Sequence, residues 1–353
     1  MTRVTSKPEV EGRAPVRRAT IRDVASHAGV SHQTVSRVIN GHPSVSEPTR
    51  DKVLATISTL GYVPSPMARG LISNRTHSIG IVAEDISDQT FARWVAGAER
   101  AARARGYYLM IGSVEPEDDE RGYLRLMLER RVEGLLLARP SVLLPLSELE
   151  PVMAAGVPIV SVGTSHPHGI AIDVDNRQGG YDATRHLIAH GHRGIATILG
   201  PADWPSTAAR LEGYRAALDE ADIPYDASLV VQGADWGLES GRAAAAELRA
   251  RGAQLTALFA HSDLIAFGAM RELRLAGLSI PDDVSVVGYD DLPVAAYVDP
   301  PLTTVHQPME ELGALAATLL LDQLAGNGAQ DAQTHLLPAQ LISRDSVARA
   351  GGA

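Results

Sequence analysis

The chain contains no cysteine among its 353 residues. A disulfide framework and a thiolate metal site are therefore excluded, and a reducing compartment is compatible with the composition. Long apolar runs are also missing, because no stretch reaches the roughly 20 residues that a membrane-spanning helix needs. The N-terminal region has no apolar signal core either. These absences predict a soluble cytoplasmic protein without a membrane partner.

Positive charge is scarce in most of the chain, and the formal net charge is −10. Residues 1–75 nevertheless hold eleven Lys and Arg against five Asp and Glu, a balance of +6 that leaves −16 for the remainder. Because attraction to phosphate dominates DNA affinity, this division confines such attraction to the N-terminal part. The acidic remainder should repel DNA, and we expect it to have another role.

The stretch Thr20–Asn40 (TIRDVASHAGVSHQTVSRVIN) has the pattern of two short helices joined by a tight turn. Thr20 is a good N-cap, and Asp23 three residues later makes an approximate capping box. Gly29 breaks the first helix, since glycine adopts a positive φ, and Ser31 caps the second. The apolar positions of both helices fall on one inner face: Ile21, Val24, Ala25, Ala28, Val35, Val38 and Ile39. The pattern predicts a helix-turn-helix.

A helical hairpin with an ordinary solvated face is the alternative, but the order A-x-x-A-G-V-S-x-x-T-V-S-R-V-x-N is too detailed for it. This run resembles the DNA-binding head of the lac repressor/purine repressor (LacI/GalR) family of bacterial transcription factors. By that resemblance His32, Gln33 and Arg37 read bases in the major groove, as suits the donors and acceptors of Gln and Arg. The resemblance also assigns polar residues to the DNA surface, chiefly as phosphate contacts: Thr20, Ser31, Thr34, Ser36 and Asn40.

The segments around the two helices complete an N-terminal domain. Residues 1–19 are polar and basic without periodicity, which predicts a disordered basic arm; a solvated tail without function is the alternative. Ser46 should cap a third helix at roughly 47–60, whose apolar residues close the small domain over residues 20–62 (the head). The head is therefore expected to be all-α.

Residues 63–76 are expected to be a hinge. In the family this position is a helix that orders on operator DNA, pairs with its dimer mate and inserts a leucine into the minor groove. By resemblance Leu71 is that wedge and Ala68 the close-packed inner face. Gly70 departs from the family pattern, and a helical glycine costs about 1 kcal/mol, so this hinge would depend more on DNA to fold. The alternative is a simple linker with Leu71 in the core of the following domain.

From Ser78 onward strands and helices alternate in two successive series. The strands are expected at 78–83, 107–113, 134–138 and 159–163, and then at 194–199, 228–231, 256–260 and 284–287. This alternation predicts an α/β body of two doubly wound parallel sheets over residues 77–345. It resembles the two-lobed periplasmic sugar-binding-protein fold.

After Thr303 the chain should cross back to the first lobe with a helix at 307–325 and return near 336–341. Lobe one is thus expected at about 77–175 plus 306–335, and lobe two at about 176–303 plus 336–345. The tail, 346–353, lacks the leucine heptad of the extra tetramer helix that some family members carry.

Ligands of such folds bind between the lobes, at the carboxyl ends of the strands. Acidic, aromatic and guanidinium side chains follow several strands, for example Asp235-Trp236 and, as a second such pair, Asp203-Trp204. Carboxylates and Arg bind vicinal hydroxyls and a ring covers a C–H face, so this set suits a mono- or disaccharide. The effector-binding residues are expected to be Phe91, Arg210, Trp236, Ser262 and Asp290, of which all but Phe91 also follow from the resemblance.

Several residues near these positions have structural interpretations. Ser262 replaces an Asn frequent in the family, and Arg210 is expected to bridge a ligand hydroxyl and Asp290. Asp263 is expected to cap its helix. Structural roles are also expected for Tyr289 and Asp291, whereas Gln178 and Asp175 are weaker ligand candidates.

The sequence gives little support for a metal site or a cofactor site. His186, His190 and His192 (HLIAHGH) imitate a metal-ligand spacing, but no carboxylate pattern accompanies them. Glycine-rich phosphate loops and a nucleophile elbow are missing from their proper contexts. We therefore expect no metal, no cofactor and no enzymatic activity.

Taken together, the residues and the resemblance predict a sequence-specific transcriptional regulator, most simply a repressor. A homodimer would bind near-palindromic double-stranded operator DNA, and a sugar between the lobes would control it. Three alternatives remain: a purine-responsive co-repressor of the same family, a sugar-binding protein without DNA function, and an enzyme that uses the cleft. The basic head and the missing signal segment argue against the second, and the missing catalytic motifs against the third.

Overall fold

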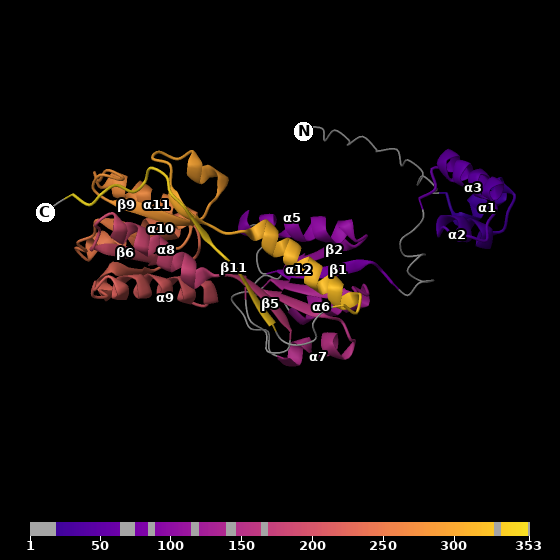
Figure 1. Ribbon diagram of the computed structural model, residues 1–353, viewed down its shortest axis with the longest axis horizontal. Coiled ribbons are helices and arrows are strands. Elements are labelled where there is room, and N and C mark those ends of the chain that lie inside the picture. Colours follow the sequence, from indigo (N-terminus) through magenta and orange to yellow (C-terminus); the bar gives the residue numbers. More distant parts are fainter. Residues whose placement is uncertain are drawn as a thin grey trace, which may run out of the picture. The chain divides into compact units, whose positions relative to one another are not determined.

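The computed structural model describes residues 19–63, 75–83, 89–113, 120–138, 146–163, 169–327 and 333–351. The chain forms two compact units, residues 1–76 and residues 77–353 (Figure 1). The predicted hinge residues Ala68, Gly70 and Leu71 lie outside the described residues, as does nearly all of the predicted arm. In the described part no helix is both long and apolar enough to cross a membrane.

Over residues 19–63 the first unit forms three helices, α1 (Ile21–Ala28), α2 (His32–Ile39) and α3 (Glu47–Leu60). The predicted caps are confirmed: Thr20 and Asp23 form a full capping box, and Ser31 accepts a hydrogen bond from the Thr34 amide. Gly29 ends α1 at φ 63°, which allows the tight turn into α2. Fully buried valines from the three helices, Val24, Val35 and Val53, form the centre of the core. The head is therefore the predicted helix-turn-helix closed by a third helix.

The second unit begins with lobe one, a six-stranded parallel sheet in the order β11-β5-β4-β3-β1-β2. Its strands are β1 (Ser78–Ala83), β2 (Tyr108–Ser113), β3 (Gly134–Ala138), β4 (Ile159–Val162), β5 (Ile170–Val174) and β11 (Gln333–Leu337). Its helices are α5 (Gln89–Ala104), α6 (Glu120–Glu129), α7 (Leu146–Ala154) and α12 (Met309–Leu324). Apolar side chains of α5 and α12 pack on one face of the sheet and those of α6 and α7 on the other.

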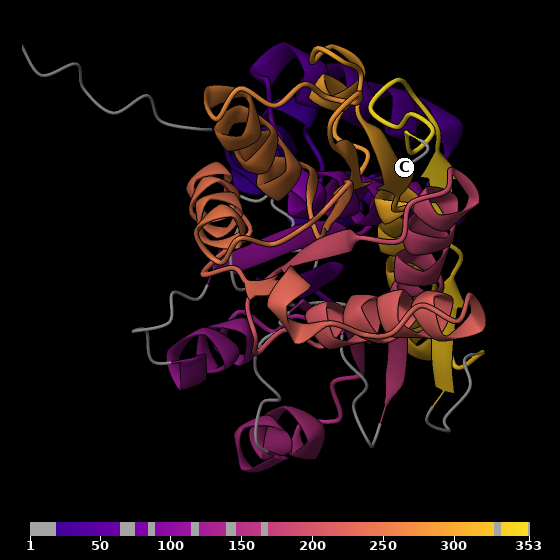
Figure 2. The ribbon, with the colours of Figure 1, turned by 90° about the vertical axis from the view of Figure 1, so that its left-hand side faces the viewer.

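Lobe two repeats this plan in the order β12-β10-β9-β8-β6-β7. Its strands are β6 (Ile195–Leu199), β7 (Val230–Gln232), β8 (Ala257–Ala260), β9 (Ser285–Asp290), β10 (Thr303–His306) and β12 (Gln340–Ile342). Its helices are α8 (Asn176–Ala189), α9 (Pro205–Glu220), α10 (Leu238–Ala250) and α11 (Asp263–Leu275), with short 3-10 turns η1 (Ala227–Leu229) and η2 (Pro293–Ala296). Helices α8 and α9 cover one face and α10 and α11 the other; Figure 2 looks onto this lobe.

The structure differs from the sequence-based prediction in three elements. Strand β12 pairs antiparallel with β10, so the second sheet is not wholly parallel as predicted. Helix α7 was not predicted, because Pro151 inside it interrupts the helical pattern. Strand β5 was also missed, because Asp173 inside it interrupts the apolar run that marks the other parallel strands.

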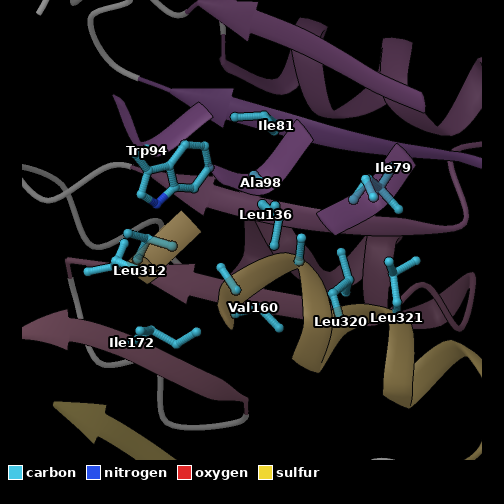
Figure 3. Packing of buried hydrophobic residues seen from close by; sticks show 14 of the residues in the cluster. Ile79, Ile81, Trp94, Ala98, Leu136, Val160, Ile172, Leu312, Leu320 and Leu321 are labelled. Carbon is cyan, nitrogen blue, oxygen red and sulfur yellow. The ribbon is translucent and has the colours of Figure 1, made fainter. Parts of the chain in front are cut away.

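The core of lobe one shows how a parallel sheet and two helices bury one another. Strand residues such as Ile79, Leu136 and Val160 face Trp94 of α5 and Leu320 of α12, and all are at most 1% exposed (Figure 3). The strands are buried on both faces, which explains why they read as continuous apolar runs rather than as alternating ones. This packing fixes α5 and α12 beside each other at the end of the sheet where the lobes meet.

Three helix pairs pack through reciprocal glycines. In α5 and α12, a Cβ on Gly97 would lie 1.9 Å from the Glu310 carbonyl oxygen, and one on Gly313 would lie 1.9 Å from the Trp94 carbonyl oxygen. Glycines also face the backbone of the partner helix in two other pairs: Gly180 and Gly213 between α8 and α9, and Gly241 and Gly268 between α10 and α11. A helical glycine costs stability by itself, so here the close backbone approach is what these positions require.

Three segments connect the two lobes, because the chain leaves lobe one after β5, returns after β10 and leaves again after β11. The first and third are joined by a 2.8 Å hydrogen bond from the Asp175 amide to the Leu337 carbonyl oxygen. Parallel crossings of this kind let two lobes move about a common hinge. The space between the lobes is where the strands of both sheets end.

Candidate functional site

A cavity of about 440 Å³ lies between the lobes, within the usual size range of small-molecule sites. Lobe one contributes residues of α5, α12 and the strand ends, and lobe two contributes the loops after its strands. The structure places all five residues expected to bind the effector in the cavity lining: Phe91, Arg210, Trp236, Ser262 and Asp290. Their contacts with a ligand stay a prediction, but the fold does bring them together.

Aromatic rings line the cavity from both sides. In lobe one Phe91 stacks on Trp94, with ring centroids 5.5 Å apart and planes 20° apart. In lobe two Trp204 meets Trp236 edge to face, with centroids 5.4 Å apart. The chain has three tryptophans, and all three belong to this lining. Trp94 was not foreseen, because on the sequence it is an ordinary apolar position of a helix.

Arg210 is buried on α9 and is held by several groups of lobe two. Its Nε donates to Asn176 Oδ1 over 2.9 Å, and its Nη1 donates to the His261 carbonyl oxygen. The guanidinium lies over the Tyr289 ring, 3.6 Å from its centroid, so a cation–π contact compensates its loss of water. Tyr289 is fully buried, which raises the pKa of its hydroxyl and supports the predicted structural role. The predicted bridge from Arg210 through a ligand to Asp290 stays a prediction.

Asp290 occupies an unusual backbone conformation at the cavity. Its φ is 115° and that of Asp291 is 51°, and two successive positive φ values are rare for residues other than glycine. The Asp290 carboxylate accepts a 2.6 Å hydrogen bond from Gln307 Nε2, and its carbonyl oxygen accepts one from Arg93 of α5 at 3.3 Å. Asp290 is thus held by lobe two, by a crossing segment and by lobe one. Such strain accumulates where a side chain must be aimed at a site.

Two further polar residues of the lining, Asp173 and Asn176, were not predicted from the sequence. Asp173 is the fourth residue of β5, and its Oδ1 accepts hydrogen bonds from the Val174 amide at 2.7 Å and from Asn176 Nδ2 at 3.4 Å. Burial raises the pKa of Asp173 to about 6. Recognition of β5 as a strand would have revealed both residues, since they stand at its carboxyl end.

Ser262, and not Asp263, caps the helix that follows them. Ser262 is the N-cap of α11, accepting from the Ile265 amide, and its hydroxyl donates to the Trp236 carbonyl oxygen at 3.0 Å. The prediction that Asp263 caps this helix is wrong. Asp263 instead accepts from the Leu292 amide at 2.7 Å and from Thr304 Oγ1 at 2.5 Å. Its burial raises its pKa to about 7, and it fastens the turn that follows Asp290.

The structural role expected for Asp291 is confirmed by its contacts. Asp291 pairs with Arg344 at 2.6 Å and with His306 at 3.0 Å, away from the cavity lining. The weaker ligand candidates Asp175 and Gln178 do not line the cavity; Asp175 is the N-cap of α8 and accepts from the Gln178 amide at 2.9 Å.

Two of the three histidines around the end of α8 have ordinary hydrogen-bond partners, whereas His186 Nε2 is buried without one among the described residues. His192 hydrogen-bonds Thr256 Oγ1 at 3.0 Å and the Ala348 carbonyl oxygen at 3.1 Å, while His190 contacts the His186 carbonyl oxygen. Burial lowers the pKa of both His186 and His192. Over the described residues no three His, Cys, Asp or Glu side chains are grouped as a metal site would require.

The second helix of the head presents an exposed polar face. His32, Gln33 and Arg37 are exposed, while Val35 and Val38 on the opposite side are buried. Ser31 and Thr34 bond each other, and Asn40 Nδ2 reaches Ser36 Oγ at 3.5 Å. This face can offer amide, imidazole and guanidinium groups to base edges.

Comparison with known proteins agrees with both units. The description "Bacterial regulatory proteins, lacI family" matches residues 20–65, and "Periplasmic binding protein-like domain" matches residues 184–347. The transcriptional regulator CelR of Thermobifida fusca is 39% identical over 336 residues, which covers 91% of this chain and 97% of that protein. The chain belongs to the LacI family. The repressor PurR of Proteus mirabilis is 40% identical, over 94% of this chain and 97% of that protein.

Solved structures give the same result for the whole regulator. The lac repressor dimer bound to operator and the anti-inducer ONPF matches with a TM-score of 0.85 and 32% identity, covering 94% of this chain and 100% of that one. A CelR–cellobiose complex matches with a TM-score of 0.69 and 38% identity, covering 93% and 100%. This LacI-family member is accordingly a DNA-binding transcriptional regulator under effector control, with the predicted helix-turn-helix head and two-lobed α/β body.

Proposed function

We propose that the regulator is a homodimeric repressor whose effector is a neutral mono- or disaccharide bound in the interlobe cavity. The observation that carries this proposal is the cavity lining, which pairs aromatic rings from both lobes with three carboxylates. A sugar ring presents apolar C–H faces and a belt of hydroxyls, and therefore requires both kinds of group at once.

The charges of the lining favour a neutral ligand. Among the described lining residues the carboxylates are Asp173, Asp235 and Asp290, and the one cationic side chain is Arg210. Arg210 already uses donors on Asn176 and on a backbone carbonyl, and its single positive charge stands against three carboxylates of the lining. A sugar phosphate would meet more repulsion than attraction, whereas hydroxyls would find acceptors.

A purine is the second candidate, because repressors named PurR are as similar to this chain as CelR is. Phe91 or Trp236 could stack on a purine ring. A purine edge also needs free amide groups, but Asn176 Oδ1 already accepts from Arg210 and Gln307 Nε2 already donates to Asp290. The acidic lining therefore supports the sugar more strongly.

For operator binding we infer two heads on a near-palindromic site. His32, Gln33 and Arg37 of each head would read base edges in the major groove. Phosphate contacts would come from the hydroxyl and amide residues of the same region, and the minor-groove contact from the hinge: Thr20, Ser31, Thr34, Ser36, Asn40, Ala68 and Leu71.

Dimer formation is supported by apolar side chains that the body leaves exposed. Tyr297 is 87% exposed and Leu275 69%, and Tyr108 of the edge strand β2 is 59% exposed. Exposed apolar side chains mark a protein–protein contact where they gather in a patch. We infer that a second copy of the chain covers them.

Calorimetric titration with a panel of sugars, sugar phosphates and purines tests the effector class. We expect binding of a neutral sugar, followed by a change in operator affinity in a gel-shift assay with that sugar. Tight binding of hypoxanthine or guanine without any response to sugars would replace the sugar by the purine. Turnover of a bound sugar would show an enzyme instead.

A further inference from the structure

Two indole N–H groups of the cavity lack a hydrogen-bond acceptor. Trp94 Nε1 and Trp236 Nε1 are both buried without a partner among the described residues. Both side chains line the cavity, Trp94 from α5 of lobe one and Trp236 from the loop that precedes α10 of lobe two. The two lobes thus each contribute one buried donor without an acceptor.

A buried donor of this kind indicates a missing partner. An indole N–H can only donate, and in proteins it normally finds an acceptor when it is buried. An unpaired donor costs stability, because its hydrogen bond to water is lost and not replaced. The partner must therefore be an acceptor oxygen that enters the cavity.

Both rings are held in place before any ligand arrives. Trp94 stacks on Phe91, and its carbonyl oxygen lies against Gly313 of α12 in the close helix contact described above. Figure 3 shows the nitrogen-bearing edge of the Trp94 ring on the side of Leu312, which also lines the cavity.

Trp236 is fixed in a similar way from the other lobe. Its carbonyl oxygen accepts the Ser262 hydroxyl, and its ring lies so close to Gly200 that a Cβ there would be 2.2 Å from the ring. Trp204 meets the ring edge to face. Neither indole needs to be ordered by the ligand, so little conformational entropy is lost on binding.

We propose that Trp94 and Trp236 determine specificity through these N–H groups. Trp94 donates to one oxygen of the sugar from lobe one, and Trp236 donates to another from lobe two. This inference rests on the proposed sugar site. It assigns Trp94 a role beyond core packing: a ligand with an oxygen facing each lobe satisfies both donors only when the lobes are closed around it. An analogue that lacks the oxygen facing Trp94 would bind to lobe two alone.

The first test uses variants that keep an aromatic ring and remove the donor. Trp94→Phe and Trp236→Phe should each weaken binding of the best sugar roughly three- to tenfold in calorimetry, the effect of one neutral hydrogen bond. Trp204→Phe, which alters the same wall without removing either of the two unpaired donors, is the matched control and should change the affinity less. A deoxy analogue lacking the acceptor should bind wild type and Trp94→Phe equally.

The second test needs no variant of Trp94 to fold. Protein labelled with 15N-tryptophan gives one indole N–H signal for each of the three tryptophans. Saturation with the sugar should move the proton signals of Trp94 and Trp236 downfield, as expected when each gains an acceptor. A sugar that binds while the Trp94 signal stays unmoved would overturn the inference and leave the sugar site intact. Absence of any sugar binding would instead refute the proposed function, and the inference with it.

Discussion

Arg37 stands on the exposed face of α2, where a guanidinium can bind the O6 and N7 atoms of guanine in two parallel hydrogen bonds. Arg37→Ala should cost about 1–3 kcal/mol on the true operator and relax the preference at one base pair. Gel shifts on the operator and on a random duplex of equal length measure the difference. Equal losses on both would show that Arg37 contacts phosphate and that another residue reads the base.

Arg210 organises one wall of the cavity through Asn176, the His261 carbonyl oxygen and the Tyr289 ring. Arg210→Ala should abolish the response to the effector and leave operator binding by the separate head unit unaffected. If the sugar is an inducer, the variant is a repressor that cannot be released. Calorimetry and an operator gel shift with and without sugar check this, and a normal response would contradict the assignment.

Asp173 should make stability depend on pH. Burial raises its pKa from 3.8 to about 6, so the folded protein binds a proton more tightly than the unfolded chain. Wild-type stability therefore falls as the pH rises from about 4 to about 6 and levels off above. Asp173→Asn, which retains an acceptor for the Val174 amide, should gain stability relative to wild type across that window in thermal melts.

Asp226 provides a control of opposite sign for this experiment. Hydrogen bonds from the Ser228 hydroxyl and amide lower the pKa of Asp226. Asp226→Asn should therefore lose stability relative to wild type as the pH rises toward about 4, and the difference should stay constant above that pH. A difference between Asp173→Asn and wild type that does not change with pH would show that Asp173 is ionised throughout.

Among the elements, α5 and α12 are the pair on which the cavity most depends, because together they carry Phe91, Trp94 and Leu312. Gly97→Ala should gain helix propensity and yet destabilise the body by about 1–3 kcal/mol, since the new methyl group would overlap the Glu310 carbonyl oxygen. Urea unfolding measures this, and effector affinity should fall with it. Ala96→Gly on the exposed side of α5 is the control, costing only about 1 kcal/mol.

Most of the helices and strands could be predicted from the sequence, because their ends are determined by residues close in sequence. Thr20, Gly29 and Ser31 determine the ends of the two head helices through their own caps, so the pattern could be read directly. Helix α7 has an internal proline and β5 an internal aspartate, so neither shows the sequence pattern of its element, and both depend on neighbours distant in sequence. The direction of β12 was likewise not readable, because it is set by pairing with β10.

The site residues that could be predicted were those that follow a recognised strand. Polar or aromatic groups at recognised strand ends, such as Trp236 and Asp290, were found. Asp173 and Asn176 were missed with their strand, and Gln307 because its partner Asp290 stands on the neighbouring strand, distant in sequence. The cap of α11 was assigned to Asp263 instead of Ser262, since either can cap a helix and tertiary contacts decide between them.

For the whole molecule, the basic head and the acidic body predict that DNA binding and sugar binding depend differently on salt. The balance of +6 over residues 1–75 and −16 over the rest predicts that DNA affinity falls steeply with salt, by a logarithmic slope of about −0.9 per phosphate contact. Affinity for a neutral sugar should hardly change over the same range, because no counterions are released. Titrations of both ligands from 50 to 200 mM salt, roughly the range over which such slopes are measured, test this. A sugar affinity that fell in parallel would point to a charged effector.

The placement of all three tryptophans around one cavity has an optical consequence. Every indole that emits when the protein is excited at the red edge of its ultraviolet absorption stands at the effector site, and the head contributes none. Intensity and wavelength of that emission therefore report the polarity of one small volume. The regulator carries its own fluorescent probe of effector occupancy, which can be followed while operator DNA is bound.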